Sequence, residues 1–147
     1  MAERKQAMGY NSIMKDLKER RFAPIYLLMG EESFYIDRLA DYMAEHILQP
    51  EERDFNQSVV FGSDITAAQL ADMARRYPMM SEYQVIIVKE AQNIKNVDAI
   101  EKYLDNPVRS TILVLCHKNG IIDRRKKILA KIEAVGVVFE SKKKRDY

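Results

Sequence analysis

The 147-residue chain is short of several groups on which function often depends. Its single cysteine, Cys116, cannot form an internal disulfide and fits a reducing cytosol. No apolar run approaches the ~18 residues that a membrane span needs, and no signal peptide is visible. The two histidines, His46 and His117, have no cysteine or carboxylate at metal-ligand spacing. These absences predict a cytoplasmic protein without a disulfide, a membrane anchor or a bound metal.

An excess of charge of one sign is also missing from most of the chain. The formal net charge is +2, yet residues 141–147 alone carry four positive side chains and one negative, a net of +3. The remainder therefore carries 2 − 3 = −1 and exerts little electrostatic attraction on nucleic acid. The basic tail could contact phosphate, but a solvated linker is the simpler interpretation.

Five short apolar runs recur along the chain, and the apolar residues within each are nearly continuous. That pattern is typical of strands buried on both faces, as in a parallel sheet covered by helices. Apolar residues at helical spacing lie between the runs, and a further helix is expected near 11–20. The order predicts an α/β domain of three layers with a mostly parallel sheet. The runs are 24–29, 58–61, 85–88, 111–115 and 136–139.

Residues typical of helix ends agree with this alternation. Thr66 with Gln69 three residues later forms a capping-box pattern, and Asn96 and Asp123 are candidate N-caps of two later helices. Proline cannot continue a helix, and glycine commonly follows a helix end. The expected stop signals are Pro78, the Asn106-Pro107 pair and Gly136.

The turn after the first strand stands where a nucleotide-binding fold would hold phosphate, but the ligands are missing. Gly30 is present, whereas Tyr35, Ile36 and Asp37 occupy the positions of the second Gly, the Lys and the Ser/Thr of a P-loop. The two glutamates at 31–32 would repel phosphate, although acids suit a helix N-terminus. The sequence therefore predicts no cofactor and a structural role for this turn.

Other chemistry is equally sparse. The third strand ends in Lys89-Glu90 instead of Asp-Glu, so it offers no Mg²⁺ ligand pair, and an exposed Lys-Glu pair is expected. Cys116 stands beside His117, but neighbouring residues on a strand point to opposite faces, which favours a core cysteine. No catalytic residue, and no catalytic activity of this chain, is expected.

The connection that leads to the third strand is the most suggestive local feature. Residues 75–81 read Arg-Arg-Tyr-Pro-Met-Met-Ser. Pro78 ends the helical pattern of the residues that precede it. Met79 and Met80 therefore fall on a surface connection, where adjacent methionines are unusual and would suit an apolar pocket on a partner. Arg75 and Arg76 would lie beside them and could meet an acidic rim. The alternative is that the methionines fold back onto the sheet edge.

Several segments together resemble the N-terminal domain of the delta subunit of bacterial DNA polymerase III, a clamp-loader subunit. The resemblance spans residues 12 to about 141, and the order and spacing of the segments are more specific than any one of them. Residues 1 to about 10 lie outside it. The segments are 24–32 with the aromatic-Ile-Asp that follows, 76–82, Leu104 with Asn106-Pro107 before 110–114, and 123–127.

This resemblance implies an AAA+-type fold, similar to P-loop NTPases, that binds no ATP. It predicts an N-terminal extension over 1–10, an AAA+-like domain over 11–140 and a basic linker over 141–147 that leads to a helical lid and a collar domain. The implied partners are the sliding clamp (the polymerase III beta subunit), other clamp-loader subunits and, in the assembled complex, DNA. No membrane partner is expected.

The resemblance also implies a clamp-binding site. In the family, two bulky apolar residues just before the third strand enter a hydrophobic pocket on the clamp and help to open the ring. By position these are Met79-Met80, or Pro78-Met79 if the alignment slips by one, with Tyr77 adjacent. Many relatives carry Leu or Phe at these positions, and Met-Met is a softer version.

Two alternatives remain open from the sequence. A degenerate P-loop phosphotransferase would bind ATP–Mg²⁺, against which Tyr35, Ile36, Asp37 and Lys89 argue. A nucleic-acid-binding module would use the tail at 142–145 and four basic residues near the start of a predicted helix. Cations there oppose the helix dipole, so they are expected to serve a partner or DNA. These four residues are Arg124, Arg125, Lys126 and Lys127.

Overall fold

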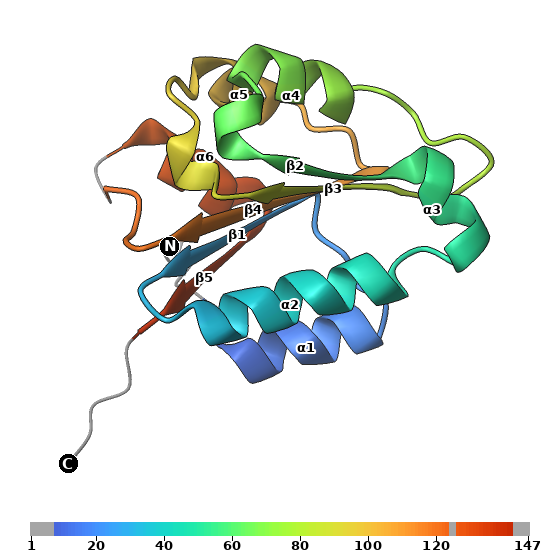
Figure 1. The fold of residues 1–147 in the computed structure, drawn as a ribbon, viewed down its shortest axis with the longest axis horizontal. Coiled ribbons are helices and arrows are strands. Elements are labelled where there is room, and N and C mark those ends of the chain that lie inside the picture. Colours follow the sequence, from blue (N-terminus) through green and yellow to red (C-terminus); the bar gives the residue numbers. More distant parts are fainter. Residues whose placement is uncertain (1–7, 124–125, 143–147) are drawn as a thin grey trace, which may run out of the picture.

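The computed structural model describes residues 8–123 and 126–142 of the chain (Figure 1). Helices and strands alternate, as the apolar runs predict. In order they are α1 (Tyr10–Lys18), β1 (Ile25–Gly30), α2 (Ser33–His46), α3 (Pro50–Asn56), β2 (Gln57–Phe61), α4 (Ala67–Ala74), β3 (Gln84–Lys89), α5 (Asp98–Tyr103), β4 (Thr111–Lys118), α6 (Lys127–Val135) and β5 (Val137–Ser141). Two 3₁₀ turns, η1 (Gly62–Asp64) and η2 (Ala91–Asn93), follow β2 and β3.

The five strands form one parallel sheet in the order β2-β3-β4-β1-β5. In the register, Leu27 at the centre of β1 lies opposite Leu115 of β4 on one side and Val138 of β5 on the other. All six residues of β1 are buried. This confirms the three-layer α/β fold and explains why the apolar runs do not alternate with polar residues.

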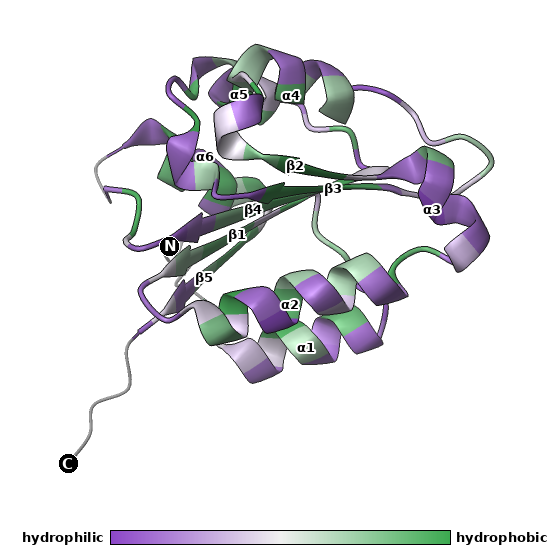
Figure 2. Cartoon of the chain, viewed as in Figure 1, coloured by the Kyte–Doolittle hydropathy of each residue, from purple (hydrophilic) through white to green (hydrophobic). Residues whose placement is uncertain are grey.

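Helices cover both faces of the sheet (Figure 1). Residues of α1 and α2 pack with Tyr26 and Leu28 of β1, whereas α4, α5 and α6 pack with Leu27 and Met29 on the other face. Figure 2 shows the strands as a mainly hydrophobic layer, while α1 and α2 carry both hydrophobic and hydrophilic residues. The sheet therefore separates two apolar cores.

Cys116 and His117 lie on opposite faces of β4, as the strand argument predicts. Cys116 is 1% exposed in the core beneath α2, and this burial raises the pKa of its thiol to about 11. His117 lines a cavity on the face covered by α5 and α6. Cys116 is therefore a core residue, and the prediction is confirmed.

Helix boundaries follow the capping signals in part. Thr66 caps α4, with Gln69 completing the box, and Gly136 follows α6 as its C-cap. The Asn96 side chain accepts the Asp98 N–H at 2.9 Å, although Val97 is the N-cap residue of α5. The expected cap at Asp123 is wrong, because α6 begins only at Lys127. A start beyond most of the basic run leaves fewer cations in the first turn, where they oppose the dipole.

One helix, α3, has no counterpart among the predicted elements. It is a short polar helix that begins with Pro50 and is closed by a capping box between Gln49 and Glu52. Its only buried residue is Asn56. A helix without an apolar stripe gives no periodic signal, so the search for core faces passes over it.

Because all five strands are parallel, the sheet has two chemically different edges (Figure 1). The carboxyl edge carries the turn after β1, whose residues stand at the positions of a P-loop. The amino edge carries the connection from α4 to β3, with α3 beside it. The two regions singled out by the sequence thus lie at opposite ends of the strands.

Candidate functional site

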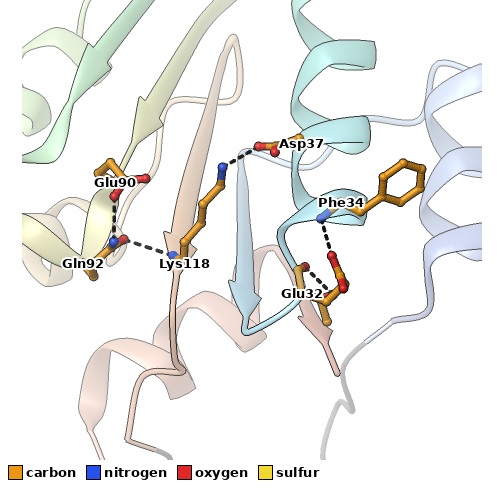
Figure 3. A network of polar contacts seen from close by, with 7 residues as sticks. Glu32, Phe34, Asp37, Glu90, Gln92 and Lys118 are labelled. Carbon is orange, nitrogen blue, oxygen red and sulfur yellow. Dashed lines mark hydrogen bonds and ion pairs between the residues drawn. The ribbon is translucent and has the colours of Figure 1, made fainter. Parts of the chain in front are cut away.

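At the carboxyl edge, polar groups that a phosphate would meet are bound within the chain (Figure 3). The Gly30 N–H donates to the Gly120 carbonyl at 3.0 Å. The Glu32 carboxylate accepts the Phe34 N–H at 3.0 Å, which places an acid on the N-terminus of α2. The Ser141 hydroxyl donates to the Glu32 carbonyl at 2.6 Å. The turn is therefore closed by its own contacts.

The P-loop positions have taken structural roles. Ile36, at the place of the P-loop lysine, is fully buried in the core between α2 and the sheet. Asp37 forms an ion pair with Lys118 at 2.7 Å, and this hydrogen bond raises the pKa of Lys118. Gly30 has a φ of +133°, and a Cβ added there would lie 2.1 Å from the Ser141 carbonyl oxygen. Gly30 is a structural glycine, and the β5 backbone needs its lack of a side chain.

The Lys89-Glu90 pair is half-buried, which corrects the expectation of an exposed pair. Glu90 adopts a left-handed conformation with a φ of 53° and accepts a hydrogen bond from the Gln92 amide at 3.0 Å. Gln92 in turn accepts the Lys118 N–H at 3.0 Å (Figure 3). This network holds the Glu90 side chain in place. Within residues 8–123 and 126–142, no three His, Cys, Asp or Glu side chains gather as a metal site would require.

At the amino edge lies the segment 77–82, here called the methionine loop. Its apolar side chains are turned to solvent: Tyr77 is 78%, Met79 64% and Met80 101% exposed. Pro78 is half-buried. Neither methionine folds back onto the sheet edge, so the alternative raised by the sequence is not what the structure adopts. The loop therefore carries three exposed apolar side chains, those of Tyr77, Met79 and Met80.

Side chains from the sheet fasten the start of this loop. The Gln84 amide donates to the Met73 carbonyl at 3.0 Å and to the Arg76 carbonyl at 2.7 Å. The Thr111 hydroxyl, which is fully buried, donates to the Ala74 carbonyl at 2.6 Å. These donors occupy the carbonyls at the end of α4. The helix ends at Ala74, before the proline that was expected to end it.

The middle of the loop is fastened to α3. Asn56 accepts the Met79 N–H at 2.6 Å and donates to the Met79 carbonyl at 2.9 Å. Met80 follows with a φ of 54°, in the left-handed region. For a residue with a side chain this conformation costs about 1–2 kcal/mol. The backbone of the loop is thus fixed, and the Met80 side chain points into solvent. Sequence reasoning missed Asn56.

Other candidate contacts surround the loop unevenly. Arg75 lies 3.6 Å from Asp72 and stacks over the Tyr103 ring at 5.8 Å, while Arg76 is exposed. Both directly precede the loop in the chain, and their role as accessory contacts stays a prediction. Arg124 and Arg125 lie outside the described residues, as does the basic tail beyond 142.

Known proteins of this shape define the class. The chain superposes on a DNA polymerase III gamma subunit-related protein of Thermotoga maritima with a TM-score of 0.57 and 18% identity, covering 92% of this chain and 46% of that one. That likeness shows the fold alone. The class is a three-layer α/β domain built on a five-stranded parallel sheet.

The family follows from a more specific match. The family described as DNA polymerase III, delta subunit, matches residues 26–142. The chain therefore belongs to the DNA polymerase III delta subunit family, as its sequence resemblance predicts.

Two proteins of Bacillus subtilis illustrate the relationship. DNA polymerase III subunit delta of strain 168 is 27% identical over 140 residues, covering 88% of this chain and 40% of the relative. The solved structure of the DNA clamp loader delta protein (YqeN) is 26% identical, with a TM-score of 0.80 over 90% of this chain and 42% of that one. This chain spans about two fifths of the length of these relatives.

Proposed function

We propose that this chain is the clamp-binding domain of a clamp-loader delta subunit and that the methionine loop is its contact with the sliding clamp. The observation that carries the proposal is the exposure of Met79 and Met80 on a loop whose backbone is held by Asn56 and Gln84. Membership of the delta subunit family supports the choice of partner.

The energetics of the loop suit a docking role. Full burial of one methionine side chain contributes about 1.5–3 kcal/mol, so the pair offers about 3–6 kcal/mol before ordering costs are subtracted. A loop that is already held loses less conformational freedom on binding. Methionine can adapt its shape to a pocket. The exposed Arg76 is available to pair with acidic residues around that pocket on the clamp.

Ring opening follows if the loop binds an opened or distorted clamp more tightly than a closed one. The equilibrium of the ring then shifts toward the open form by the difference between the two affinities. This step needs no ATP at the present domain, whose Gly30 turn is closed by internal contacts. In this proposal, ATP is hydrolysed by other loader subunits, which this protein meets through lid and collar domains.

The decisive variant is Met79→Asp with Met80→Asp, measured by titration calorimetry against the sliding clamp. Two charges in an apolar pocket should weaken binding by more than about 100-fold, which corresponds to about 2.7 kcal/mol. Both side chains are exposed, so the fold should survive. A folded double variant that binds the clamp with unchanged affinity would sink the proposal.

Phe34→Asp provides a matched control. Phe34 is also a large exposed apolar residue, at 55%, but it lies in the first turn of α2 at the carboxyl edge. An acid is compatible with a helix N-terminus. The control should therefore bind the clamp as the unchanged chain does, which separates a specific contact from a general loss of apolar surface.

A further inference from the structure

Asn56 makes an unusual set of contacts for a residue on a surface helix. It is only 4% exposed, and its side-chain amide forms two hydrogen bonds with the backbone of Met79: it accepts the N–H at 2.6 Å and donates to the carbonyl at 2.9 Å. The same Nδ2 donates to the Glu52 carbonyl of α3 at 3.0 Å. The side chain therefore joins α3 to the loop, as a neighbouring strand would pair with that residue.

Few other side chains could replace this amide. The Met79 backbone offers its N–H and its carbonyl, from the peptide groups before and after its Cα, so the partner must accept and donate at adjacent positions. Asparagine does both, whereas a carboxylate only accepts and an aliphatic residue does neither. A buried side chain that keeps both bonds satisfied also avoids the cost of an unpaired polar group.

The helix that carries Asn56 is itself fastened to the end of α2. The Arg53 guanidinium donates to the Glu45 carbonyl, and the Gln57 amide donates to the Ala44 carbonyl at 3.0 Å. Glu52 closes the capping box of α3, and its carboxylate accepts the Gln49 N–H at 2.8 Å. The pKa of Glu52 is lowered by this bond and, to a smaller degree, by a hydrogen bond with Ser81 of the loop. These contacts hold α3, and with it Asn56, in a fixed position.

The position of Asn56 decides where Met80 points. Met80 is the next residue after the clamped peptide, is fully exposed, and holds a left-handed φ of 54° without any burial of its side chain. A conformation that is unfavourable for methionine persists only where its surroundings impose it. The paired Met79 peptide is the nearest such constraint.

We propose that Asn56 is a positioning residue for clamp binding: it fixes the Met79 peptide so that Met79 and Met80 are presented in their binding conformation before the clamp arrives. This inference rests on the proposed function of the methionine loop. At 4% exposure, Asn56 offers almost no surface to a partner. Without Asn56, the loop should become ordered only when the clamp binds, and this loss of conformational entropy should lower the affinity.

Asn56→Asp is the sharpest variant, because it keeps the size of the side chain and replaces the donor with an oxygen that faces two carbonyls. With the chain otherwise intact, clamp affinity should fall about tenfold. Hydrogen exchange at the Met79 and Met80 amides should accelerate, while exchange in β3 stays slow. Ile132→Val, a buried change in α6 on the face of the sheet away from α2, is the control for modest destabilisation and should leave affinity unchanged.

A double-mutant cycle with Met80→Ala tests whether Asn56 acts through the loop. If each change alone weakens binding about tenfold, the double variant should fall well short of the roughly hundredfold loss expected of independent sites. Fully additive losses would overturn the proposal, since Asn56 would then act elsewhere. If Asn56→Asp does not fold, Asn56→Ala carries the same expectations without a new charge.

Two further outcomes separate this inference from the proposed function. If Met80→Ala weakens binding but Asn56→Asp, with its Met79 amide released to exchange, binds normally, then positioning by Asn56 is refuted and the loop remains the clamp site. If neither Met80→Ala nor the Met79→Asp, Met80→Asp pair changes affinity, the proposed function fails, and the inference with it.

Discussion

At the carboxyl edge of the sheet, polar groups of the Gly30 turn are bound to one another, whereas at the amino edge the methionine loop leaves its apolar side chains in solvent. Both regions are turns next to a central strand, and both are held by hydrogen bonds from distant residues. The carboxyl edge uses Gly120, Ser141 and Lys118 to close over itself. The amino edge uses Asn56 and Gln84 to hold a backbone whose side chains stay available.

The difference shows how one fold can exchange a ligand for a partner. A phosphate site needs free N–H groups and a cation, and the Gly30 turn has committed its N–H and supplies acids. A docking loop needs the reverse: a satisfied backbone and unsatisfied apolar surface. Each of the following changes tests one side of this contrast, beginning with the largest expected effect.

Gly30→Ala should be the most damaging single change at the carboxyl edge. The new Cβ would lie 2.1 Å from the Ser141 carbonyl oxygen, and alanine would have to hold a φ of +133°. Strain and the forced movement of β5 together should cost about 3–5 kcal/mol of unfolding free energy. Chemical denaturation followed by circular dichroism measures this loss.

Two other glycines separate the causes. Gly120 has a φ of +148° but nothing within 4 Å of an added Cβ, so Gly120→Ala should show the strain without the clash, about 1–3 kcal/mol. Gly9 has open space and a φ of −77°, so Gly9→Ala should be nearly neutral. A Gly30→Ala protein as stable as Gly9→Ala would mean that this edge is not closed by β5.

Much of this fold follows from the sequence, because strands buried on both faces are read directly from their apolar residues. The run 111–115, for example, lies within β4, and Thr66 caps α4 as predicted. Short-range signals of this kind depend on neighbours in the chain. The exposure of Met79 and Met80 could likewise be argued from the proline beside them.

The support of the methionine loop could not be predicted in the same way. Asn56 and Met79 are 23 residues apart, and the sequence around each residue does not indicate that they pair. The helix that carries Asn56 buries no apolar stripe, although Pro50 at its start and the Gln49–Glu52 box could have indicated it. Long-range polar contacts depend on the assembled sheet, so only the structure reveals them.

Thr111→Val tests how firmly the amino edge is fastened. The change keeps the side-chain shape but removes the hydroxyl that donates to the Ala74 carbonyl at 2.6 Å and accepts from the Gln84 amide at 3.0 Å. The Ala74 carbonyl would keep only the longer bond from the Tyr103 hydroxyl at 3.5 Å, so the unfolding free energy should fall by about 1–3 kcal/mol. Thermal and chemical denaturation measure the loss.

Thr111→Ser is the control for this change, since it keeps the hydroxyl and removes only a methyl group. It should restore most of the stability that valine loses. If valine and serine prove equally stable, the hydroxyl does not anchor the end of α4, and the contrast between a held backbone and free side chains would weaken.

Met80→Asn should change folding stability slightly and clamp binding greatly. Asparagine tolerates the left-handed conformation of Met80, so the unfolding free energy should stay equal or rise by up to about 1 kcal/mol. The apolar contact would be lost with the side chain. Differential scanning calorimetry and clamp titration on the same sample measure both effects.

Met79→Asn supplies the comparison, because that position lies outside the left-handed region and gains nothing from asparagine. It should weaken clamp binding without any stabilisation. A Met80→Asn protein that is clearly less stable than the Met79 variant would contradict the strained, presented conformation of the loop.

The smallest expected effect is at the carboxyl edge: ATP–Mg²⁺ at millimolar concentration should leave the melting temperature unchanged. A ligand stabilises a folded protein only to the extent that it binds it. Here the Gly30 and Phe34 N–H groups are already bonded, and Lys118 is paired with Asp37. Phosphate would have to break these contacts and approach Glu31 and Glu32, which repel it.

Lys118→Met makes the result interpretable. If ATP–Mg²⁺ raises the melting temperature of the unchanged chain and this substitution abolishes the rise, nucleotide binds at the carboxyl edge and the two edges are not as different as their contacts suggest. If a rise survives the substitution, the binding lies elsewhere on the surface. An unchanged melting temperature in both proteins would leave ATP to other subunits, as expected of a turn whose Gly30 and Phe34 N–H groups are already bonded and whose glutamates repel phosphate.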